Sequence, residues 1–213
     1  MNQNIEYTKL DPTITSREVR EMVKLAIDRK YRAVVLPYTC LRIAQHIKKL
    51  YKSDVKVVTV YGFPFDKYNQ DILTTYKNMY DDLDVVIPIK EYYSNKNLDK
   101  VKELLNQVRK SLPDKKVKLI IETLLMTDKE KQIKEICELC KECKIDIVKT
   151  NTGLIKRENF AELLDDIKII KKYWKGEVKA AGGIKKREQV KQLLDLGVNY
   201  IGTSQDIGGE TNA

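Results

Sequence analysis

Two lysines stand at the ends of short apolar stretches, in the segments DIVKTNTG (146–153) and VKAAGG (178–183). They are Lys149 and Lys179, and a glycine-containing loop follows each of them. A lysine that follows buried apolar residues must either extend its ammonium group to water or take part in chemistry. An amine that is neutral near pH 7 is the nucleophile that forms Schiff bases with carbonyl compounds. The two lysines are therefore the first candidates for a catalytic site.

Lys149 and Lys179 are expected to lie on consecutive parallel strands. Adjacent strands are about 4.8 Å apart, so inward-facing lysines at matching heights would hold their ammonium groups close together. Each positive charge then disfavours the other, and partial burial acts in the same direction. Lowering a lysine pKa from about 10.4 to about 7 costs roughly 4 to 5 kcal/mol, which indicates a functional role. The alternative is that either lysine points outward between helices and pairs with a carboxylate.

The elements around these lysines follow a regular order. Short apolar runs alternate with longer amphipathic segments, which is typical of parallel strands joined by crossover helices. Eight strands are predicted, at residues 6–12, 32–37, 55–61, 84–89, 117–122, 145–150, 177–181 and 199–203. Seven helices are predicted between them, at about residues 16–29, 40–50, 67–81, 97–111, 127–143, 157–173 and 185–196.

This order predicts a (β/α)8 TIM barrel, an α/β fold in which eight parallel strands close into a cylinder. No Pro-, Gly- or Ser-rich linker divides the chain, so residues 1–213 are predicted to form a single domain. Only SQDIGGETNA follows Thr203, so the eighth helix is predicted to be missing or reduced to a turn. Active sites of this fold lie at the carboxyl ends of the strands. The polar residues predicted at or near these ends are Asp11, Asp84, Lys90, Glu122, Lys149, Thr150, Lys179, Thr203 and Ser204.

The composition limits the classes of protein and partner. With 213 residues and 42% hydrophobic content, the chain can bury a substantial core. Its 40 Lys and Arg against 31 Asp and Glu give a net charge of +9, but acids and bases are interspersed, which favours a solvated surface over a nucleic-acid site. No apolar run could span a bilayer, and the start MNQNIEYTK lacks the apolar core of a signal peptide. We therefore expect a cytoplasmic protein with neither nucleic acid nor membrane as a partner.

Three cysteines, Cys137, Cys140 and Cys143, form a C-x2-C-x2-C pattern that on its own would suggest a metal or iron–sulfur site. They fall in a predicted continuous helix, and no fourth ligand follows at the spacing of a cluster. Packed thiols, which behave as small buried hydrophobic groups, are the favoured interpretation. The single histidine, His46, lies on a predicted helix remote from the strand ends, which argues against histidine-based catalysis and most zinc sites.

The segment around Lys149 resembles the Schiff-base strand of the deoxyribose-phosphate aldolase family, whose usual form is close to D-F-[IV]-K-T-S-T-G. Further segments agree with this family in order and spacing, so the resemblance extends from about residue 8 to residue 204. These segments are LDPT (10–13), VVTVYGFPFD (57–66), DDLDVVIPI (81–89), IIET (120–123) and VKAAGGI (178–184). The paired K-T-x-T-G and K-x-x-G-G motifs at this separation form a specific pattern.

The resemblance implies a class I aldolase of DeoC type with a TIM-barrel fold, which reversibly cleaves 2-deoxy-D-ribose 5-phosphate to D-glyceraldehyde 3-phosphate and acetaldehyde. Lys149 would then form the Schiff base, and the charge of Lys179 would keep Lys149 partly neutral. Asp84 would relay protons through a bound water, a role that suits a carboxylate within reach of the reacting atoms. Without the resemblance, Asp84 reads as a strand-start carboxylate paired with a lysine. The protonated imine serves as the electron sink, so neither a metal nor a cofactor is expected.

The substrate-binding residues follow from the same family pattern. Asp11 and Thr13 match positions near the substrate hydroxyls, and Ser204 matches a serine that contacts the phosphate. Glycine-containing loops after the last strands of such barrels often cradle a phosphate group. The predicted substrate- and phosphate-binding residues are Asp11, Thr13, Thr150, Gly153, Gly182, Gly183, Gly202 and Ser204. Leu154 and Gln205 depart from the family, in which a lysine and a serine are common there, so the natural substrate is left open.

Two alternatives stay open on the sequence alone. One is a Schiff-base aldolase of the same fold that acts on another sugar phosphate or aldehyde, as the departures at Leu154 and Gln205 suggest. The other is a non-catalytic basic protein that binds nucleic acid through its positive surface. The favoured interpretation implies small-molecule partners, the sugar phosphate and acetaldehyde, and leaves a homo-oligomer open.

Overall fold

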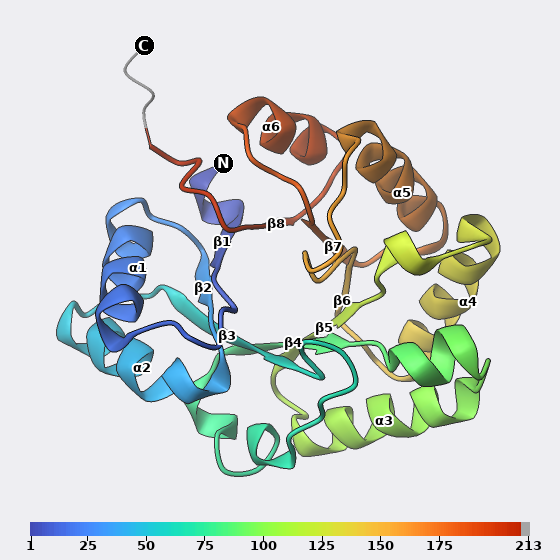
Figure 1. Cartoon of the computed structure of the whole chain (residues 1–213), viewed down its shortest axis with the longest axis horizontal. Coiled ribbons are helices and arrows are strands. Elements are labelled where there is room, and N and C mark those ends of the chain that lie inside the picture. Colours follow the sequence, from blue (N-terminus) through green and yellow to red (C-terminus); the bar gives the residue numbers. More distant parts are fainter. Residues whose placement is uncertain (210–213) are drawn as a thin grey trace.

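Eight parallel strands form a closed barrel at the centre of the computed structural model, which describes residues 1–209 (Figure 1). Each strand pairs with its neighbours in chain order, and β1 pairs with β8 to close the cylinder. The strands are β1 (Ile5–Thr8), β2 (Ala33–Val35), β3 (Lys56–Tyr61), β4 (Asp82–Val86), β5 (Lys116–Ile120), β6 (Ile147–Lys149), β7 (Glu177–Ala181) and β8 (Tyr200–Thr203). The predicted (β/α)8 barrel is confirmed.

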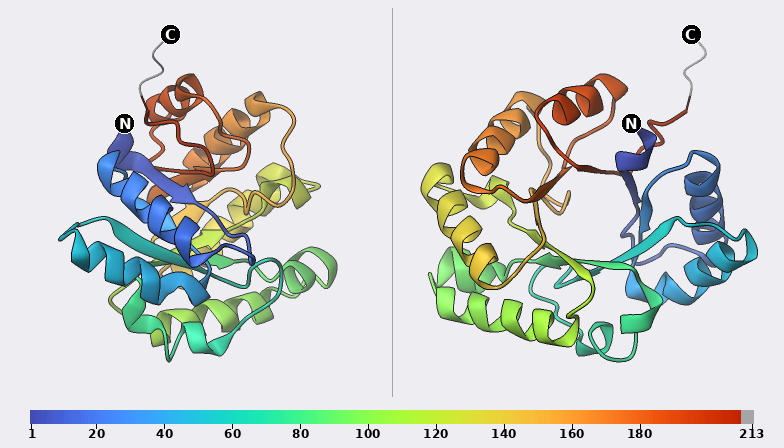
Figure 2. Two further views of the ribbon diagram at one scale, coloured as in Figure 1. Left: turned by 60° about the vertical axis from the view of Figure 1, so that its left-hand side comes forward. Right: turned by 180° about the vertical axis from the view of Figure 1, so that it is seen from behind.

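The structure has six α-helices within residues 1–209. They lie around the outside of the barrel (Figure 2). They are α1 (Ser16–Asp28), α2 (Leu41–Leu50), α3 (Leu98–Ser111), α4 (Lys129–Glu142), α5 (Phe160–Tyr173) and α6 (Arg187–Asp195). Each buries one apolar face; in α3, for example, Val101, Leu105 and Val108 are buried at helical spacing. No helix follows β8 up to residue 209, in agreement with the short segment that remains after this strand.

The helix predicted at residues 67–81 does not form, so this prediction is wrong. Two short 3-10 turns, Gln70–Ile72 and Lys77–Met79, lie in the connection between β3 and β4 instead. The side chain of Asn69 caps the first turn by accepting a hydrogen bond from the backbone N–H of Asp71. Asparagine, threonine and tyrosine, which are frequent in this segment, favour local backbone hydrogen bonds or lose rotamer freedom in a helix. The apolar side chains of the segment therefore reach the core from turns.

The register of the strands sets charged residues at matching heights. Lys149 on β6 pairs with Lys179 on β7, and Asp84 on β4 pairs with Lys118 on β5. Successive side chains of a strand point to opposite faces, so Asp82 shares the inward face of β4 with Asp84. The matching heights expected for the two lysines are confirmed.

The barrel interior is partly apolar and partly charged. A small aliphatic cluster fills the side formed by β2, β3 and the carboxyl ends of β4 and β5. Its members are Ala33, Val35, Val58, Val60, Val86 and Ile120. The charged side chains of the interior come from β1, β4, β5, β6 and β7. Because a buried charge is costly unless it is paired, this charged region calls for a functional explanation.

Candidate active site

Lys149, Lys179 and Asp84 meet inside the barrel. The Nζ atom of Lys149 lies 2.8 Å from Oδ2 of Asp84, and the Nζ atom of Lys179 lies 2.7 Å from the same oxygen. The side chain of Lys149 is 2% exposed, and those of Lys179 and Asp84 are fully buried. The structure thus brings together the three residues with predicted catalytic roles, and neither lysine points outward between the helices.

Asp84 lies in the middle of its strand and not at the strand start that the sequence predicted. The strand β4 begins earlier, at Asp82, whose backbone pairs with Val58 on one side and Lys116 on the other. Because aspartate is depleted in strands, the sequence pattern predicts a start for this strand at residue 84, two residues after the start of β4. The charge of Asp82 is tolerated there because Lys118 lies 3.2 Å from its Oδ2 atom.

Lys118 on β5 is one of four further charged residues to which the sequence analysis gave no role. Its Nζ atom lies 3.1 Å from Oδ1 of Asp84 and 3.2 Å from Oδ2 of Asp82. The carboxylate of Glu6 on β1 lies 3.6 Å from the same Nζ atom. The carboxylate of Asp84 is therefore shared among three lysines, and Lys118 is held by three carboxylates.

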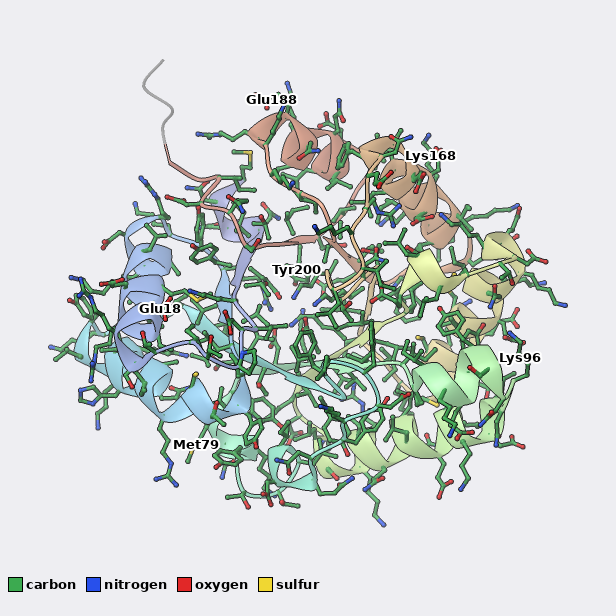
Figure 3. The ribbon with its side chains drawn as sticks, in the orientation of Figure 1. Glu18, Met79, Lys96, Lys168, Glu188 and Tyr200 are labelled. Atoms are coloured by element: carbon green, nitrogen blue, oxygen red, sulfur yellow. The ribbon has the colours of Figure 1, made fainter. Side chains whose placement is uncertain are left out.

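Arg32, Glu6 and Asp82 complete the charged cluster. The guanidinium group of Arg32 donates to Glu6 and, at 2.6 Å, to Oδ2 of Asp82. Glu6 also accepts a hydrogen bond from Lys179. The ring of Tyr200, which is labelled near the centre of Figure 3, lies 4.2 Å from the guanidinium carbon of Arg32. Ion pairs and hydrogen bonds thus connect the amino end of β2 to the lysines near the carboxyl ends of β6 and β7.

Burial lowers the pKa of Lys149 to about 8, and the nearby charge of Lys179 acts in the same direction. The carboxylate of Asp84 opposes this effect without cancelling it. An amine with such a pKa is about one-tenth neutral at pH 7, against less than about one part in a thousand for an ordinary lysine. The surroundings of Lys149 therefore favour nucleophilic attack.

The pKa shifts of Asp84, Glu6 and Lys118 favour their ionised forms. Burial alone would raise the pKa of Asp84, but the three lysines around it lower it well below its usual value. Burial alone would also raise the pKa of Glu6, but the charges of Lys118 and Lys179 outweigh this effect and lower the pKa. For Lys118 burial alone would lower the pKa, but the surrounding carboxylates raise it. Lys149 is thus set apart from Lys118 by the direction of its pKa shift.

The glycines predicted to bind phosphate lie in or beside the loops at the carboxyl ends of β6, β7 and β8. Gly153, Gly182 and Gly183 have φ angles of 87°, 98° and 80°, in the left-handed region that favours glycine. A Cβ atom on Gly202 would lie 3.2 Å from Cε of Lys179, so the missing side chain allows β8 to approach that lysine. The structure groups these glycines at one end of the barrel, and their contacts with phosphate stay predictions.

Thr150, directly after Lys149, joins the ends of β6 and β7. Its hydroxyl donates to the carbonyl of Ala181 at 2.9 Å and accepts from the N–H of the same residue at 3.0 Å. These two bonds fix the strand end that carries Lys149, and the predicted substrate contact of Thr150 stays a prediction. Ser204 and Leu154 are exposed in the loops that follow β8 and β6.

The sequence profile that describes DeoC/LacD family aldolases matches residues 3–204. The chain belongs to this family. The deoxyribose-phosphate aldolase of Thermococcus gammatolerans is 35% identical over 213 residues, which cover 95% of this chain and 92% of the relative. The deoxyribose-phosphate aldolase of Staphylococcus carnosus is 31% identical over 210 residues, with the same coverage of 95% and 92%.

Solved structures share the barrel of this DeoC/LacD family chain. An aldolase called QR15 superposes with a TM-score of 0.84 at 28% sequence identity, over 95% of this chain and 90% of its own. The deoxyribose phosphate aldolase from Aeropyrum pernix, described as a unique tetramer, gives a TM-score of 0.77 at 25% identity, over 95% of this chain and 86% of its own. The family fold therefore extends along nearly the whole chain.

Asp11 and Thr13, which the family resemblance assigned to the substrate hydroxyls, are not brought to the lysines. Both are exposed in the loop between β1 and α1, where the hydroxyl of Thr13 donates to Oδ1 of Asp11 at 2.6 Å. The β1 carboxylate that contacts a lysine of the cluster in this DeoC/LacD family member is Glu6. A contact of Asp11 or Thr13 with substrate stays a prediction.

A buried carboxylate outside the lysine cluster fixes the loop that follows Lys149 in this aldolase-family barrel. Glu122 accepts a hydrogen bond from the side-chain amide of Asn151 at 2.9 Å. It also accepts bonds from the N–H and the hydroxyl of Thr152, at 3.0 and 2.5 Å. Glu122 itself has a φ angle of 47°, which is uncommon for a residue other than glycine and indicates that these contacts hold it there.

Replacing Glu122 with glutamine is expected to lower both thermal stability and affinity for a phosphorylated substrate. The amide of glutamine would direct an NH2 group at one of the donors of this loop, and a buried hydrogen bond lost in this way costs about 1–3 kcal/mol. The midpoint of thermal unfolding should fall by several degrees, and KM should rise more than kcat falls. Glu158→Gln, an exposed change in the same loop, is the control. An unchanged midpoint in Glu122→Gln would show that the carboxylate does not hold the loop.

The cysteines in α4 and directly after it are buried thiols in the hydrophobic core. Cys137 and Cys140 are fully buried and Cys143 is 1% exposed, and none of them is in a disulfide. Burial raises the pKa of Cys137 to about 12, so this thiol stays protonated. Among residues 1–209, no group of histidine, cysteine, aspartate or glutamate side chains is arranged to hold a metal ion. These observations support the packed-thiol interpretation, and His46 is exposed on α2.

Proposed function

We propose that this chain cleaves 2-deoxy-D-ribose 5-phosphate reversibly to D-glyceraldehyde 3-phosphate and acetaldehyde, as a class I aldolase with a Schiff base on Lys149. The proposal rests on the buried pair of lysines that share one oxygen of Asp84, with the pKa of Lys149 lowered to about 8. Family membership and the deoxyribose-phosphate aldolases among the relatives support the reaction and the substrate. The chain is an enzyme, so the alternative of a non-catalytic protein is not retained.

The first stage is attack by the neutral Nζ atom of Lys149 on the C1 aldehyde carbon of the open-chain sugar phosphate. A C–N bond forms, and the carbonyl electron pair moves to oxygen, which takes up a proton to give a carbinolamine. Loss of this oxygen as water leaves a protonated imine. Asp84, 2.8 Å from Nζ, is the proposed group that accepts the proton from nitrogen and returns one to the leaving oxygen through a bound water.

The protonated imine then acts as the electron sink for cleavage of the C2–C3 bond. A base removes the proton of the C3 hydroxyl, the C2–C3 electron pair forms the C1=C2 bond of an enamine, and glyceraldehyde 3-phosphate leaves. Protonation at C2 regenerates an imine, and addition of water releases acetaldehyde and free Lys149. Lys179, which shares Oδ2 of Asp84 with Lys149, is the proposed partner in these proton transfers.

The substrate phosphate is proposed to bind at the loops after β6, β7 and β8. The left-handed conformation of Gly182 and Gly183 and the exposed hydroxyl-bearing Ser204 support this position. A surface with a net charge of +9 would also help to attract an anionic sugar phosphate.

Borohydride trapping tests the proposed function. The protein is incubated with acetaldehyde, and separately with 2-deoxyribose 5-phosphate, then reduced, digested and mapped by mass spectrometry. One adduct confined to Lys149 with both compounds is the expected result. An adduct with acetaldehyde alone would keep the chemistry and indicate a different aldol pair, as the departures at Leu154 and Gln205 suggest. No adduct at Lys149 with either compound would exclude the Schiff-base mechanism.

The rate of imine formation is expected to rise with pH through a midpoint near pH 8. The lowered pKa of Lys149 means that the reactive neutral amine increases from about one-tenth at pH 7 to about nine-tenths at pH 9. The measurement is the initial rate of acetaldehyde trapping at Lys149, quenched at short times between pH 6 and 10. A midpoint near 10.5, the value of an ordinary lysine, would contradict the proposed activation.

The remaining partner and location assignments stay predictions. None of the helices within residues 1–209 is long and apolar enough to cross a lipid bilayer. A cytoplasmic location and the absence of a nucleic-acid partner are expectations from the sequence. The tetramer described for the Aeropyrum pernix protein supports a homo-oligomer as the expected assembly of this chain.

A further inference from the structure

The charged cluster inside the barrel contains more cations than anions. It holds four cationic side chains against three carboxylates, so its ionised form carries one positive charge in excess. The members are Glu6, Arg32, Asp82, Asp84, Lys118, Lys149 and Lys179. All are buried or nearly so, and Arg32 is the most exposed, with 14% of its side chain accessible. Because an unbalanced buried charge is costly, loss of one proton from the cluster would remove the imbalance.

The contacts determine which cation gives up that proton. A guanidinium group does not deprotonate in proteins, so Arg32 keeps its charge. Lys118 contacts three carboxylates, whereas the only carboxylate within ion-pair distance of Lys149 among residues 1–209 is Asp84, which it shares with Lys179. Lys149 is therefore the cation with the least compensation in the cluster.

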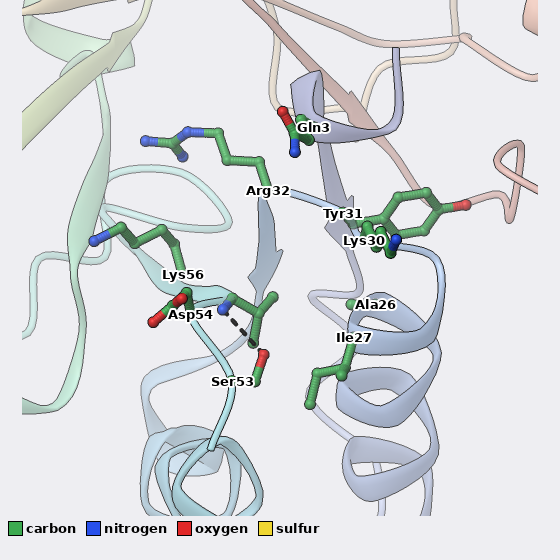
Figure 4. A pocket seen from close by; sticks show the side chains of 10 residues that line it. Gln3, Ala26, Ile27, Lys30, Tyr31, Arg32, Ser53, Asp54 and Lys56 are labelled. Carbon is green, nitrogen blue, oxygen red and sulfur yellow. Dashed lines mark hydrogen bonds between the residues drawn. The ribbon is translucent and has the colours of Figure 1, made fainter. Parts of the chain in front are cut away.

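Arg32 lies far along the barrel from the reacting lysine. It directly precedes β2, at the amino-terminal end of the barrel, whereas Lys149 is the last residue of β6. Its side chain borders a pocket of about 460 Å³ at that amino-terminal end, which Figure 4 shows from close by. Substrate at the carboxyl ends of the strands would not touch Arg32. Its two carboxylate partners, Glu6 and Asp82, both lie within ion-pair distance of Lys118, and Glu6 also contacts Lys179.

We propose that Arg32 is a positioning residue that keeps Lys149 reactive from the opposite end of the barrel. Its guanidinium group pairs with Glu6 and Asp82 and so offsets negative charge that would otherwise favour the ammonium form of Lys149. This inference rests on the proposed Schiff-base function. It assigns to the amino-terminal end of the barrel a role in the chemistry at the carboxyl-terminal end.

The other groups around the cluster do not supply the positive charge that Arg32 places beside Glu6 and Asp82. Tyr200 on β8 offers its ring face to Arg32, and beyond it Lys116 and Glu177 pair with each other at 2.6 Å. Lys30, Asp54 and Lys56 line the adjacent pocket, but none of them is within ion-pair distance of Glu6 or Asp82. The groups that face Lys149 itself are Asp84 from β4, Lys179 from β7 and Glu6 from β1. Among residues 1–209, Arg32 is thus the one cation other than the three lysines in direct contact with the carboxylates of the cluster.

The first test replaces Arg32 with methionine and measures the protonation of Lys149 directly. Trace-level reductive methylation with formaldehyde, followed by peptide mapping, reports the neutral fraction of Lys149 as a function of pH. Loss of one positive charge at this range should raise the midpoint by roughly one pH unit. At pH 7 the rate of labelling should then fall about tenfold, whereas above pH 10 it should equal that of the wild type.

Two control variants separate this effect from damage to the fold. Arg32→Lys keeps the positive charge and should restore the wild-type midpoint. Arg109→Met removes an arginine of similar exposure, 17%, which pairs with Asp146 outside the barrel interior. It should leave the midpoint unchanged. A lower labelling rate at every pH with the wild-type midpoint in Arg32→Met would overturn the proposal.

A second variant, with an expected pKa shift of opposite sign, keeps the proposal testable if Arg32→Met does not fold. Asp82→Asn removes one carboxylate of the cluster, so the midpoint of Lys149 should move to lower pH. The double variant Arg32→Met/Asp82→Asn should return it close to the wild-type value. A shift of Asp82→Asn to higher pH, or no shift, would count against charge compensation, because general structural damage does not reverse sign between two variants.

The same samples distinguish failure of this proposal from failure of the proposed function. Acetaldehyde and borohydride are applied in parallel to the wild type. If no adduct forms at Lys149, the Schiff-base function is wrong, whatever the methylation midpoints show. If the adduct forms but Arg32→Met leaves the methylation midpoint in place, the function stands and the role of Arg32 is wrong.

Discussion

Replacing Lys149 with methionine is expected to abolish cleavage of 2-deoxy-D-ribose 5-phosphate and to leave the fold at least as stable as the wild type. Methionine has no amine and cannot form an imine, so kcat should fall by at least about a thousandfold. The pKa of Lys149, lowered from 10.5 to about 8, means that its buried surroundings as a whole disfavour the ammonium form by roughly 3 kcal/mol. An apolar side chain of similar length removes this cost. An aldehyde-coupled assay and thermal unfolding at pH 7 measure the two effects.

The stability effect of Lys149→Met should depend on pH in a defined direction. Between about pH 8 and pH 10.5 the unfolded wild-type chain binds more protons at Lys149 than the folded chain does. The contribution of Lys149 to wild-type stability therefore becomes more favourable as pH rises through this window, and below it the full burial cost is present. The advantage of the variant in free energy of unfolding should be largest near neutral pH and should disappear above about pH 10.5.

Lys118→Met is the matched control for this prediction. Lys118 is fully buried but contacts three carboxylates, so its removal takes one ion-pair partner from each of Glu6, Asp82 and Asp84. Breaking a buried ion pair in this way costs about 3–5 kcal/mol, so stability should fall. Equal losses of stability in both lysine variants would refute the burial cost assigned to Lys149. A trapped acetaldehyde adduct in Lys149→Met would mean that the nucleophile lies elsewhere.

Asp84→Asn is expected to reduce both activity and stability strongly. The two oxygens of Asp84 accept hydrogen bonds from Lys118, Lys149 and Lys179, whereas asparagine has one acceptor and an NH2 group that would face an ammonium group. The loss of charge compensation should cost about 3–5 kcal/mol. Loss of the proposed proton relay should lower kcat by about 10²- to 10⁴-fold. Steady-state kinetics and chemical denaturation measure these losses separately.

The pH dependence of Asp84→Asn gives a further check. The carboxylate of Asp84 raises the pKa of Lys149 against the effect of burial, so its removal should shift the midpoint of Lys149 labelling to lower pH. Asp165→Asn, on the exposed surface of α5, serves as the control and should change neither the midpoint nor the stability. A shift of the Asp84→Asn midpoint to higher pH would contradict the assigned electrostatics, and unchanged turnover would contradict the proton relay.

The reactive pair could be predicted because two local signals coincide at each lysine. Lys149 and Lys179 each end a short apolar run and precede a glycine-containing loop, and the alternation of strands and helices set the two strands side by side. Matching heights then followed from the parallel register. The same alternation gave the barrel, and the resemblance at Asp84 identified the carboxylate between the lysines.

The rest of the cluster could not be predicted, because burial there depends on depth in the barrel and not on local pattern. Lys116 and Lys118 stand on the same face of β5, yet Lys116 is 45% exposed at the barrel end and Lys118 is fully buried. Glu6 stands at the first residue of the strand predicted at 6–12. Arg32 is distinguished from other arginines only by its carboxylate partners on β1 and β4. Nothing in the sequence near these residues carries that information. The helix predicted at 67–81 is wrong for a related reason. The apolar residues of this segment lie in turns and are buried by contacts with the rest of the fold, not by the packing of a regular helix face.

The charged side chains of the interior come from strands that are far apart in the sequence, and this affects how the chain can fold. Lys179 on β7 meets Glu6 on β1 only after β8 has joined the two ends of the sheet. An open sheet that lacked this closure would leave three buried lysines with Asp82 and Asp84 but without Glu6. Such an interior, with more ammonium groups than carboxylates, would be expected to stay hydrated instead of packing. Assembly of the interior should therefore be concerted, with dehydration and closure in one step. A fragment that ends before β7 would be expected to remain a loosely packed, water-filled sheet.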